Sequence, residues 1–527
     1  MSRRKTYRFN CAKTTTDIEP AILLWVYRIL IKLNVHSEFV DQHGVNHDGL
    51  SQLLNIDATC TDFDLKSVRS QLNRNYKKAE KFSEETHYAS SLRTNISRLA
   101  ELVGLNDTDS RILEFAIFIH TEPFLDEIAD GIGKLSSLKL YRILSVILGI
   151  PLFDIRASLC SNGLLSRSGL LAIEHSTCQL SCKLNLLSEH FADTMQSSEA
   201  DPVHLLRGTV SPASTGELRL EHYSHIQSSL NILLPYLATA MINGRRGVNI
   251  LLHGEPGTGK SQLVRALAKE LSYELFEVSS ENSQGEPMAG KHRLRSYSAA
   301  QCFFAKHRAL IVFDEIEDVF NDGCNFLGLN STAQTHKAWV NRMLEDSSLP
   351  TFWLSNCIEG MDRAFIRRFD MIIELPVPTR NQREKILTQE CSDLIDSSTI
   401  SRIAESESLA PAVVTRAASV VRCIRGELGE GPSAKAFEQI ISSTLKAQGH
   451  KPSRKNDANR LPEVYDPYFI NADSDLAAIA TGIIRSGAGR LCLFGPPGTG
   501  KTAFGRWLAT KMDVPLIVKR ASDLVSP

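Results

Sequence analysis

Apolar residues recur at two different spacings along this chain, and the change of spacing separates a helical part from an α/β part. In the first 210 residues they return every three or four positions, as in the stripe between Ile22 and Leu33. That spacing predicts amphipathic helices. Beyond Gly247, short continuous apolar runs alternate with helical stretches, a pattern typical of a parallel sheet covered by helices. The predicted strands are 248–252, 275–278, 309–313, 350–356 and 371–375.

The N-terminal part contains two predicted helical regions, 1–105 and 106–210. Basic residues between Lys66 and Lys81 are interleaved with glutamates, which favours a solvated helix surface over a face for nucleic acid or an acidic partner. In the second region, helices followed by a turn and a short hairpin at 161–174 resemble a winged helix. DNA binding is only weakly supported, because the candidate recognition helix lacks a cluster of Arg or Lys.

Composition favours none of the partners that strong charge or long apolar segments would attract. The chain has 527 residues, 43% of them hydrophobic and 23% charged, and a net charge of −1. The longest apolar stretches, 21–33 and 140–153, contain Arg or Lys and are too short for a bilayer span, so no membrane segment is expected. Eleven scattered cysteines, and no apolar signal segment after the first residues, favour reduced thiols and a cytoplasmic location.

Two cysteines, Cys178 and Cys182, have His175 and His190 nearby and invite comparison with a zinc site. Their C-x₃-C spacing is also one turn of a helix, and no second cysteine pair follows. Zinc binding is therefore not predicted.

The first predicted strand of the sheet leads into the sequence Gly-Glu-Pro-Gly-Thr-Gly-Lys-Ser at 254–261, and a helical pattern follows. This order of strand, G-x-x-x-x-G-K-[ST] loop and helix predicts a phosphate-binding P-loop. The glycines let backbone N–H groups face a phosphate, Lys260 neutralises the β- and γ-phosphates, and the Ser261 hydroxyl reaches Mg²⁺. The candidate nucleotide-binding residues are Gly254, Glu255, Pro256, Gly257, Thr258, Gly259, Lys260 and Ser261.

Two carboxylates follow the predicted strand 309–313 directly. An apolar run that ends in Asp314 and Glu315, 54 residues after Lys260, is a Walker B pattern. In such a pair Asp314 holds the Mg²⁺ shell, and Glu315 orients and deprotonates the attacking water. Asn356 ends the next strand; because ligands lie at the carboxyl ends of parallel strands, it is predicted to sense the γ-phosphate or the water. A turn-initiating Asn is the alternative.

These motifs, together with the string D-R-A-F-I-R-R-F-D at 362–370, resemble an AAA+ ATPase of the classical AAA type. This is the group of valosin-containing-protein-like tandem unfoldases, here of bacterial type. The resemblance covers 218–447 fully and a second copy incompletely. It implies an α/β P-loop NTPase fold with a parallel sheet and a helical lid, ATP and Mg²⁺ as ligands, and a hexameric or other ring. Each site would be completed by an arginine of the neighbouring subunit, with surface salt bridges as the alternative role, and the matching positions are Arg367 and Arg368.

Two further positions of the family are matched less closely. The stretch 282–290, where unfoldases of the family present an aromatic pore loop, contains no aromatic residue, and Met288 is its candidate for gripping a polypeptide. Arg416, early in a predicted lid helix, matches either a residue that touches the γ-phosphate or an ordinary lid arginine. Threading by this ring is therefore a weaker expectation than ATP hydrolysis.

A second P-loop follows the first by 241 residues and is an internal repeat. A strand at 490–494 and a helix at 503–511 flank it, and a further strand is predicted at 515–518. No Walker B or sensor sequence follows, so the chain is expected to be truncated within this module and not to hydrolyse ATP there. The candidate residues are Gly495, Pro496, Pro497, Gly498, Thr499, Gly500, Lys501 and Thr502, with Thr502 as the Mg²⁺ ligand.

The predicted boundaries and function follow from these assignments. After the connection 197–216, the domains are an ATPase core at 218–380, a lid at 381–447, a linker at 448–467 and a partial second core at 468–527. The expected function is ATP hydrolysis coupled to remodelling of a protein substrate selected by residues 1–210. The alternative is a nucleotide-switched scaffold or DNA-associated protein, in which Arg156 and Arg167 would contact DNA.

Overall fold

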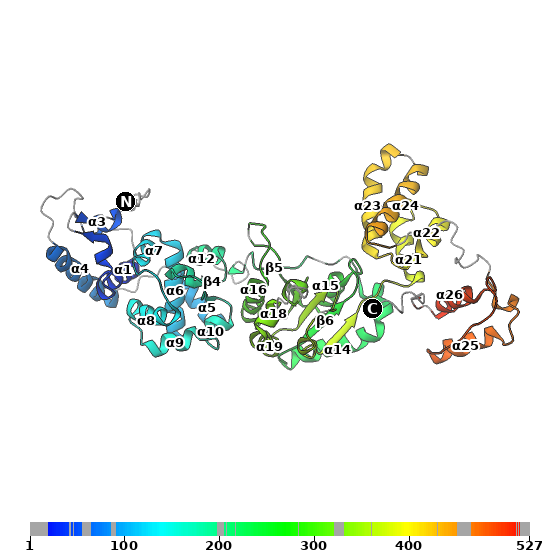
Figure 1. Ribbon diagram of the computed structural model, residues 1–527, viewed down its shortest axis with the longest axis horizontal. Helices are drawn as coiled ribbons and strands as arrows, with labels where there is room; N and C mark the ends of the chain where they lie inside the picture. The colour runs from blue at the N-terminus through cyan, green and yellow to red at the C-terminus, as the bar shows by residue number, and fades with distance from the viewer. Residues whose placement is uncertain are drawn as a thin grey trace.

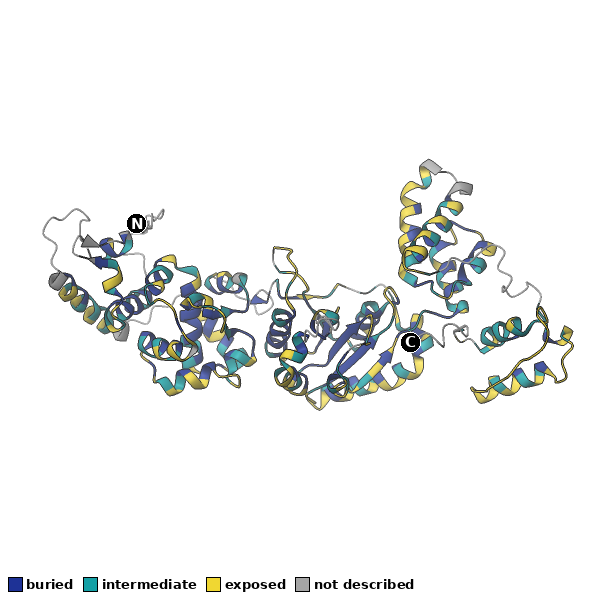
Figure 2. Ribbon diagram, viewed as in Figure 1, coloured by how far each residue is buried: buried dark blue, intermediate teal, exposed yellow. Residues whose placement is uncertain are grey.

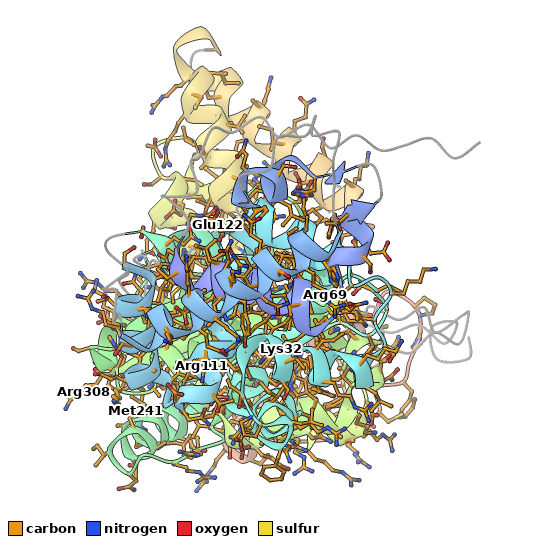
Figure 3. The ribbon with its side chains drawn as sticks, turned by 90° about the vertical axis from the view of Figure 1, so that its left-hand side faces the viewer. Lys32, Arg69, Arg111, Glu122, Met241 and Arg308 are labelled. Atoms are coloured by element: carbon orange, nitrogen blue, oxygen red, sulfur yellow. The ribbon has the colours of Figure 1, made fainter. Side chains whose placement is uncertain are left out.

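The fold is taken from a computed structural model, which describes residues 19–41, 44–45, 47–54, 65–85, 91–197, 205–206, 208–214, 216, 218–282, 284–320, 331–359, 361–428, 430–450, 465–512, 514 and 516. An N-terminal helical body, a central sheet covered by helices, a helical lid and a short C-terminal part follow one another along the long axis (Figure 1). Figure 3 looks along this axis from the N-terminal side, where Lys32 and Arg69 mark two helices of the body.

The N-terminal body is helical, as its apolar spacing predicted. The predicted stripe forms α1 (Pro20–Lys32), whose buried side chains include Trp25 and Ile29, and the basic helix is α4 (Leu65–Glu85). Asn106 caps α6 with a reciprocal capping box, in which Asp109 Oδ2 accepts the Asn106 N–H. The other helices are α2 (His36–Phe39), α3 (Asp48–Leu54), α5 (Ser91–Val103), α6 (Asp107–Thr121), α7 (Pro123–Asp130), α8 (Ser137–Leu148), α9 (Leu152–Leu159) and α12 (Glu189–Gln196).

A hairpin is present in this body, but its second strand lies further along the chain than predicted. Strand β3 (Leu171–Ile173) pairs antiparallel with β4 (Leu184–Leu186). The segment 161–174, which the sequence assigned to the hairpin, contains the short helix α10 (Leu164–Arg167) and only the first strand. Another short helix, α11 (Leu180–Lys183), lies between the two strands. The pattern of Leu and Ile residues in this segment fits a helix turn and a strand equally well, which explains the error.

The central sheet has the strand order β10-β6-β9-β8-β7-β5. All its neighbouring pairs are parallel except β5 with β7. The five predicted strands are confirmed as β6 (Asn249–His253), β7 (Glu274–Val278), β8 (Ala309–Phe313), β9 (Thr351–Ser355) and β10 (Met371–Glu374). β5 (Val210–Pro212) was assigned to a connection, because three residues that include a proline give no strand signal.

Helices cover this sheet, and one of them begins eight residues before its predicted start. The sequence placed a helix at 298–307 after a polar loop, whereas α16 runs from Gly290 to Phe303. Its N-terminal turns carry Lys291, His292 and Arg293, which concealed it from a search for apolar periodicity. The other helices here are η2 (Leu220–Ile226), α14 (Gln227–Ile242), α15 (Lys260–Leu271), α17 (Glu317–Phe320), α18 (Thr332–Thr335), α19 (Lys337–Asp346) and α20 (Arg363–Ile366).

The N-terminal body and one face of the sheet share a single hydrophobic core. Helix α16 lies between them and is buried on nearly all sides (Figure 2). Polar contacts reinforce this packing: Arg295, 4% exposed, donates to the Asn185 side chain at 2.8 Å and to the Gly169 carbonyl at 3.0 Å. Lys291 also pairs with Glu174 at 3.2 Å, and that partner helps lower the pKa of Glu174 to about 2, after the hydrogen bond from Ser176. The hairpin is therefore attached to α16.

Gly169 is expected to be essential to this attachment. Its φ is +70°, and a Cβ there would lie 2.4 Å from the Arg295 carbonyl oxygen. Gly133 has a similar φ of +77° but open space around it, so it isolates the backbone cost. We expect Gly133→Ala to cost about 1 kcal/mol, and Gly169→Ala about 3 kcal/mol of unfolding free energy, since it also clashes. Urea unfolding of both variants measures the difference; equal costs would contradict the close approach.

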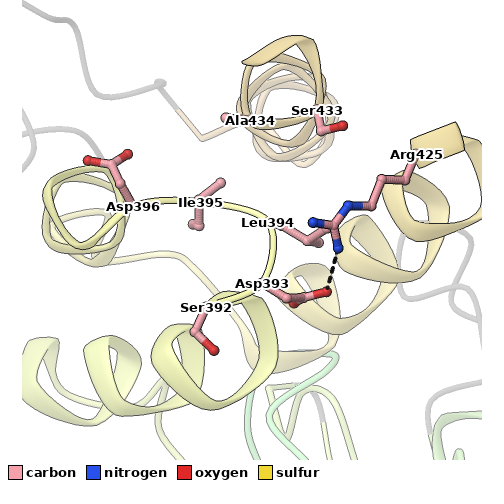
Figure 4. A pocket seen from close by; sticks show the side chains of 8 residues that line it. All are labelled: Ser392, Asp393, Leu394, Ile395, Asp396, Arg425, Ser433 and Ala434. Carbon is pink, nitrogen blue, oxygen red and sulfur yellow. Dashed lines mark ion pairs between the residues drawn. The ribbon is translucent and has the colours of Figure 1, made fainter. Parts of the chain in front are cut away.

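The predicted lid contains the helices α21 (Arg380–Cys391), α22 (Ser397–Ala404), α23 (Pro411–Leu428) and α24 (Glu430–Ala447), with a hydrophobic core of their own. A cavity of about 390 Å³ lies among them (Figure 4). Asp393 and Arg425 pair at its wall at 3.5 Å. The other lining residues are Ser392, Leu394, Ile395, Asp396, Ser433 and Ala434, so the cavity includes none of the predicted nucleotide site.

The C-terminal part contains η4 (Pro467–Phe469), α25 (Leu476–Ser486) and α26 (Lys501–Met512), the last confirming the predicted helix at 503–511. The predicted strand 490–494 is not formed, because no described strand lies beside it to pair with. Leu493 is 38% exposed and Phe494 86% exposed. Most of the predicted strand 515–518 and most of the linker 448–467 lie outside the described residues.

Within the described residues, no single helix is long and apolar enough to cross a membrane. The apolar segments 138–148 and 152–167 reach the required length only when they are counted together, and they meet at an angle of 120°.

Candidate functional site

The predicted P-loop joins β6 to α15 in the conformation that a phosphate-binding loop requires. Gly254, Gly257 and Gly259 have φ values of +149°, +82° and +97°, which glycine adopts without a steric penalty. A Cβ at Gly254 would lie 2.2 Å from the Leu375 carbonyl oxygen. The loop turns sharply at these glycines and leads into the N-terminus of α15, where backbone N–H groups favour an anion.

Lys260 connects the P-loop to the end of β9. Its Nζ donates to the carbonyls of Gly254 at 2.8 Å and Glu255 at 3.1 Å, and to Asn356 Oδ1 at 2.9 Å. Burial lowers the pKa of Lys260, and the carboxylates of Asp314 and Glu317 oppose this effect. The lysine and the predicted sensor amide, 96 residues apart in the sequence, are therefore in direct contact.

Ser261 makes a second connection, to the end of β8. Its hydroxyl donates to Asp314 Oδ2 at 2.9 Å. A hydroxyl and a carboxylate at this separation are two hard oxygen donors of the kind that Mg²⁺ takes beside substrate phosphates. They fit the implied Mg²⁺. The described residues contain no group of three or more His, Cys, Asp or Glu that could hold a metal without such phosphates.

Glu315 follows with an unusual backbone. Its φ of +52° lies in the left-handed region that a glutamate rarely occupies, and its N–H donates to Asp314 Oδ1 at 2.8 Å. Such strain persists only where neighbouring groups hold it in place, and it gathers at functional sites. The Glu315 side chain is exposed at the edge where β6, β8 and β9 end.

Two residues that the sequence did not single out hold this edge together. Glu317 Oε1 accepts from the Ser355 hydroxyl at 2.8 Å and from the Asn356 N–H, and so fixes the end of β9 to the segment after β8. Arg293 of α16 donates to the carbonyls of Asp314 and Glu315. Glu317 could have been suspected because it lies only three residues after Asp314. Arg293 was missed because the sequence placed the start of its helix at residue 298.

The two candidate finger arginines lie in different surroundings at the end of α20. Phe365 and Phe369 are buried and anchor the segment, and Asp370 accepts the Asn249 N–H at 2.9 Å. Arg368 forms an ion pair with Glu345 of α19. Arg367 is exposed and, within the part of the chain that the structure describes, makes no ion pair or side-chain hydrogen bond.

The lid and η2 each donate a hydrogen bond to a backbone carbonyl of the P-loop. The Ala412 N–H at the start of α23 donates to the Gly257 carbonyl at 3.2 Å. The Tyr223 hydroxyl donates to the Gly259 carbonyl at 2.9 Å, and burial raises the pKa of this tyrosine. Arg416 is exposed one turn further along α23, and the stretch 282–290, including Met288, precedes α16.

The second P-loop, at 495–502, has the conformation of the first without its surroundings. Gly495, Gly498 and Gly500 repeat the positive φ values, and Lys501 Nζ donates to the Gly495 carbonyl at 2.8 Å. Neither an amide nor a carboxylate from another strand contacts this lysine among the described residues.

Comparison with known proteins finds a family profile that matches two parts of this chain. The profile described as "ATPase family associated with various cellular activities (AAA)" matches residues 250–377 and 491–527. The human protein called ATPase family gene 2 protein homolog B is 26% identical over 306 residues, which are 53% of this chain and 40% of that protein. The chain spans less than half the length of the mammalian relatives of this name that it matches.

Other proteins match a smaller part of the chain. The proteasome-activating nucleotidase of Methanosphaerula palustris is 31% identical over 157 residues, covering 28% of this chain and 37% of that protein. The pachytene checkpoint protein 2 homolog of Arabidopsis thaliana is 28% identical over 245 residues, covering 40% and 52%. Among solved structures, C. elegans PCH-2 aligns at 17% identity and a TM-score of 0.31, over 41% of this chain and 69% of that one.

Proposed function

From the AAA ATPase domain that residues 250–377 form, we propose that this chain binds ATP with Mg²⁺ and hydrolyses it to ADP and phosphate. One observation carries the proposal: Lys260 contacts Asn356, and Ser261 contacts Asp314, so that the ends of β6, β8 and β9 converge on one loop. In a parallel sheet this edge is where ligands bind.

The proposed roles follow from the side chains at this edge. The backbone N–H groups of residues 254–261 and the Lys260 ammonium hold the phosphates. Ser261 and Asp314 would hold Mg²⁺, which would supply positive charge to stabilise the phosphates. Glu315 takes the proton of the attacking water, and Asn356 orients that water or the γ-phosphate.

Ring assembly is part of the proposal, with Arg367 as the group that enters the neighbouring site. An arginine finger must leave its own subunit free to reach a phosphate, and an ion pair within the subunit would have to break first. Arg368 has such a partner in Glu345, and exposed Arg367 has none among the described residues. The pair that the sequence left undecided is therefore proposed to divide its work, with Arg368 supporting α19.

A tandem, valosin-containing-protein-like organisation and a remodelling output are also part of the proposal. The family profile matches at a second place, 491–527, and one relative is named as a nucleotidase that activates a proteasome. Residues 1–210 would select the protein substrate. The segment 282–290 lacks an aromatic grip, so an unfolded substrate would be held through Met288 and the backbone.

A nucleotide-switched, DNA-associated scaffold is the second candidate. One of the arginines considered for DNA contact, Arg167, lies 3.4 Å from Asp346 of the ATPase domain, and this pairing favours the remodeller. Stimulation of turnover distinguishes the two functions: acceleration by an unfolded protein supports remodelling, and acceleration by DNA alone supports the switch.

Lys260→Ala tests nucleotide binding directly. We expect ATP affinity to fall roughly 100-fold, because the charge-assisted hydrogen bonds to phosphate are lost. Lys501→Ala is the same change in the second P-loop. It should leave ATP affinity at the first site within about twofold, because an exposed charge in a separate loop has little effect on that site. Titration with a fluorescent ATP analogue measures both, and unchanged affinity of the Lys260 variant would exclude the proposed site.

A further inference from the structure

We propose that Arg293 is a positioning residue for Glu315: its buried guanidinium fixes the turn after β8 from which the Glu315 carboxylate acts. The inference rests on the proposed ATP hydrolysis and adds to it a residue of α16 that lies outside the P-loop, the acid pair and the finger segment. It starts from the surroundings of one side chain that is almost completely enclosed.

The guanidinium of Arg293 uses all three of its nitrogens. Nη2 donates to the Asp314 carbonyl at 2.5 Å, and Nη1 donates to the Glu315 carbonyl at 3.0 Å and to Asp318 Oδ2 at 3.0 Å. Nε donates to the Ser279 carbonyl at 3.3 Å. The guanidinium carbon lies 4.5 Å from the centre of the Phe313 ring, which closes one face. One side chain therefore contacts three consecutive residues, 313–315, and the residue that begins the loop after β7.

The backbone that Arg293 holds is the strained one. Glu315 has a φ of +52°, which costs a residue with a Cβ on the order of 1–3 kcal/mol and requires compensation from outside. The carbonyls on both sides of that φ rotation belong to Asp314 and Glu315, and both accept from Arg293. Because the guanidinium is a planar fork, it fixes the relative orientation of the two carbonyls, and a single ammonium does not.

The charge balance around Arg293 also suits a structural clamp near the water-activating carboxylate. Burial lowers the pKa of Arg293, and the nearby carboxylates of Asp318, Glu315 and Asp314 oppose this effect. The Arg293 side chain is 1% exposed, and its partner Asp318 is 51% exposed. The cation is thus shielded from solvent and held by fixed carbonyl dipoles, where its hydrogen bonds are strong.

Arg293→Lys is the test variant, because it keeps the charge and most of the volume. Arg295→Lys is its matched control: Arg295 lies two residues along the same helix, is 4% exposed, and binds Asn185 and Gly169 instead of the turn. Two measurements are made on the full chain. One is kcat together with the dissociation constant of a non-hydrolysable ATP analogue, and the other is deuterium uptake by peptides that cover 313–319.

We expect Arg293→Lys to lower kcat roughly 10- to 100-fold through misplacement of Glu315, with affinity for the analogue changed less than about threefold. Uptake at 313–319 should rise in this variant only. Arg295→Lys should raise uptake near 169–187 and leave kcat within about threefold, because its contacts lie away from the reacting groups. Equal losses of kcat in the two variants, or normal kcat in Arg293→Lys, would overturn the proposal.

The uptake measurement separates this proposal from the proposed function. If the unaltered chain hydrolyses no ATP, the proposed function fails; raised uptake at 313–319 in Arg293→Lys alone would still show that Arg293 holds the turn, and unchanged uptake would refute it. Asp318→Ala serves if Arg293→Lys does not fold, because this half-exposed partner can be removed without opening the core. Asp318→Ala should lower kcat and raise deuterium uptake at 313–319, as expected for Arg293→Lys. No change in either quantity would contradict the proposed role of Arg293.

Discussion

Replacing Arg367 by alanine is expected to lower ATP turnover on the order of 1000-fold, the scale of a trans arginine that stabilises charge in phosphoryl transfer. Nucleotide affinity should change little, because the site that binds ATP within the same subunit keeps Lys260 and Ser261. Arg368→Ala is the control: it removes the neighbouring guanidinium, whose partner is Glu345, and should reduce turnover only a few-fold, as for an exposed ion pair.

Mixing two inactive variants tests whether Arg367 acts on its neighbour. An Arg367→Ala subunit keeps its own Glu315, and a Glu315→Gln subunit keeps its own Arg367. In a randomly mixed ring about one quarter of the interfaces join the intact carboxylate of one subunit to the intact arginine of the next. Recovery of turnover on mixing is therefore expected. No recovery, or a larger loss in Arg368→Ala than in Arg367→Ala, would reject this assignment.

Glu315→Gln should also reduce turnover by about 1000-fold, the upper part of the range for loss of a general base. ATP binding should persist, since the amide has nearly the shape of the carboxylate and the P-loop contacts remain. The positive φ of residue 315 should be retained, because the substitution leaves the backbone hydrogen bonds of this residue intact.

Glu270→Gln provides the control for this charge change. Glu270 is exposed near the end of α15, away from the edge where the strands end, and its replacement should leave turnover within about twofold, as for an ordinary surface substitution. Steady-state phosphate release and binding of the ATP analogue are measured for both variants. Undiminished turnover in Glu315→Gln would remove this residue from its role and leave Asp314 or Glu317 as the base to examine.

Five of the six strands of the sheet were predictable because they are short, predominantly apolar runs. Buried parallel strands leave that signal in the sequence, and β6, β7, β8, β9 and β10 were all predicted. The site followed from the strands, since a parallel sheet brings Lys260, Asp314 and Asn356 to one edge. The contacts of Lys260 with Asn356 and of Ser261 with Asp314 agree with that expectation, and the catalytic roles remain predictions.

The features that the sequence did not predict share a physical cause, because they depend on polar contacts that form only in the folded chain. Helix α16 is buried by arginine hydrogen bonds as well as by apolar contacts, so its first two turns look like a polar loop. Arg293 and Glu317 bind backbone groups, and the residue types in a sequence do not show where backbone groups lie in the fold. The choice between the two adjacent arginines depended on Glu345, which approaches only in the folded chain.

The covered position of α16 bears on what can be cut from this protein. A fragment that begins at residue 218 would lack both β5, the strand that pairs with β7, and the hairpin that binds Arg295. Its open strand edge would recruit other chains, and aggregates are the expected product in a cell that makes this piece alone. The central sheet and the N-terminal helical body are therefore expected to be retained together, because a shorter version would need another segment to cover the exposed strand and α16.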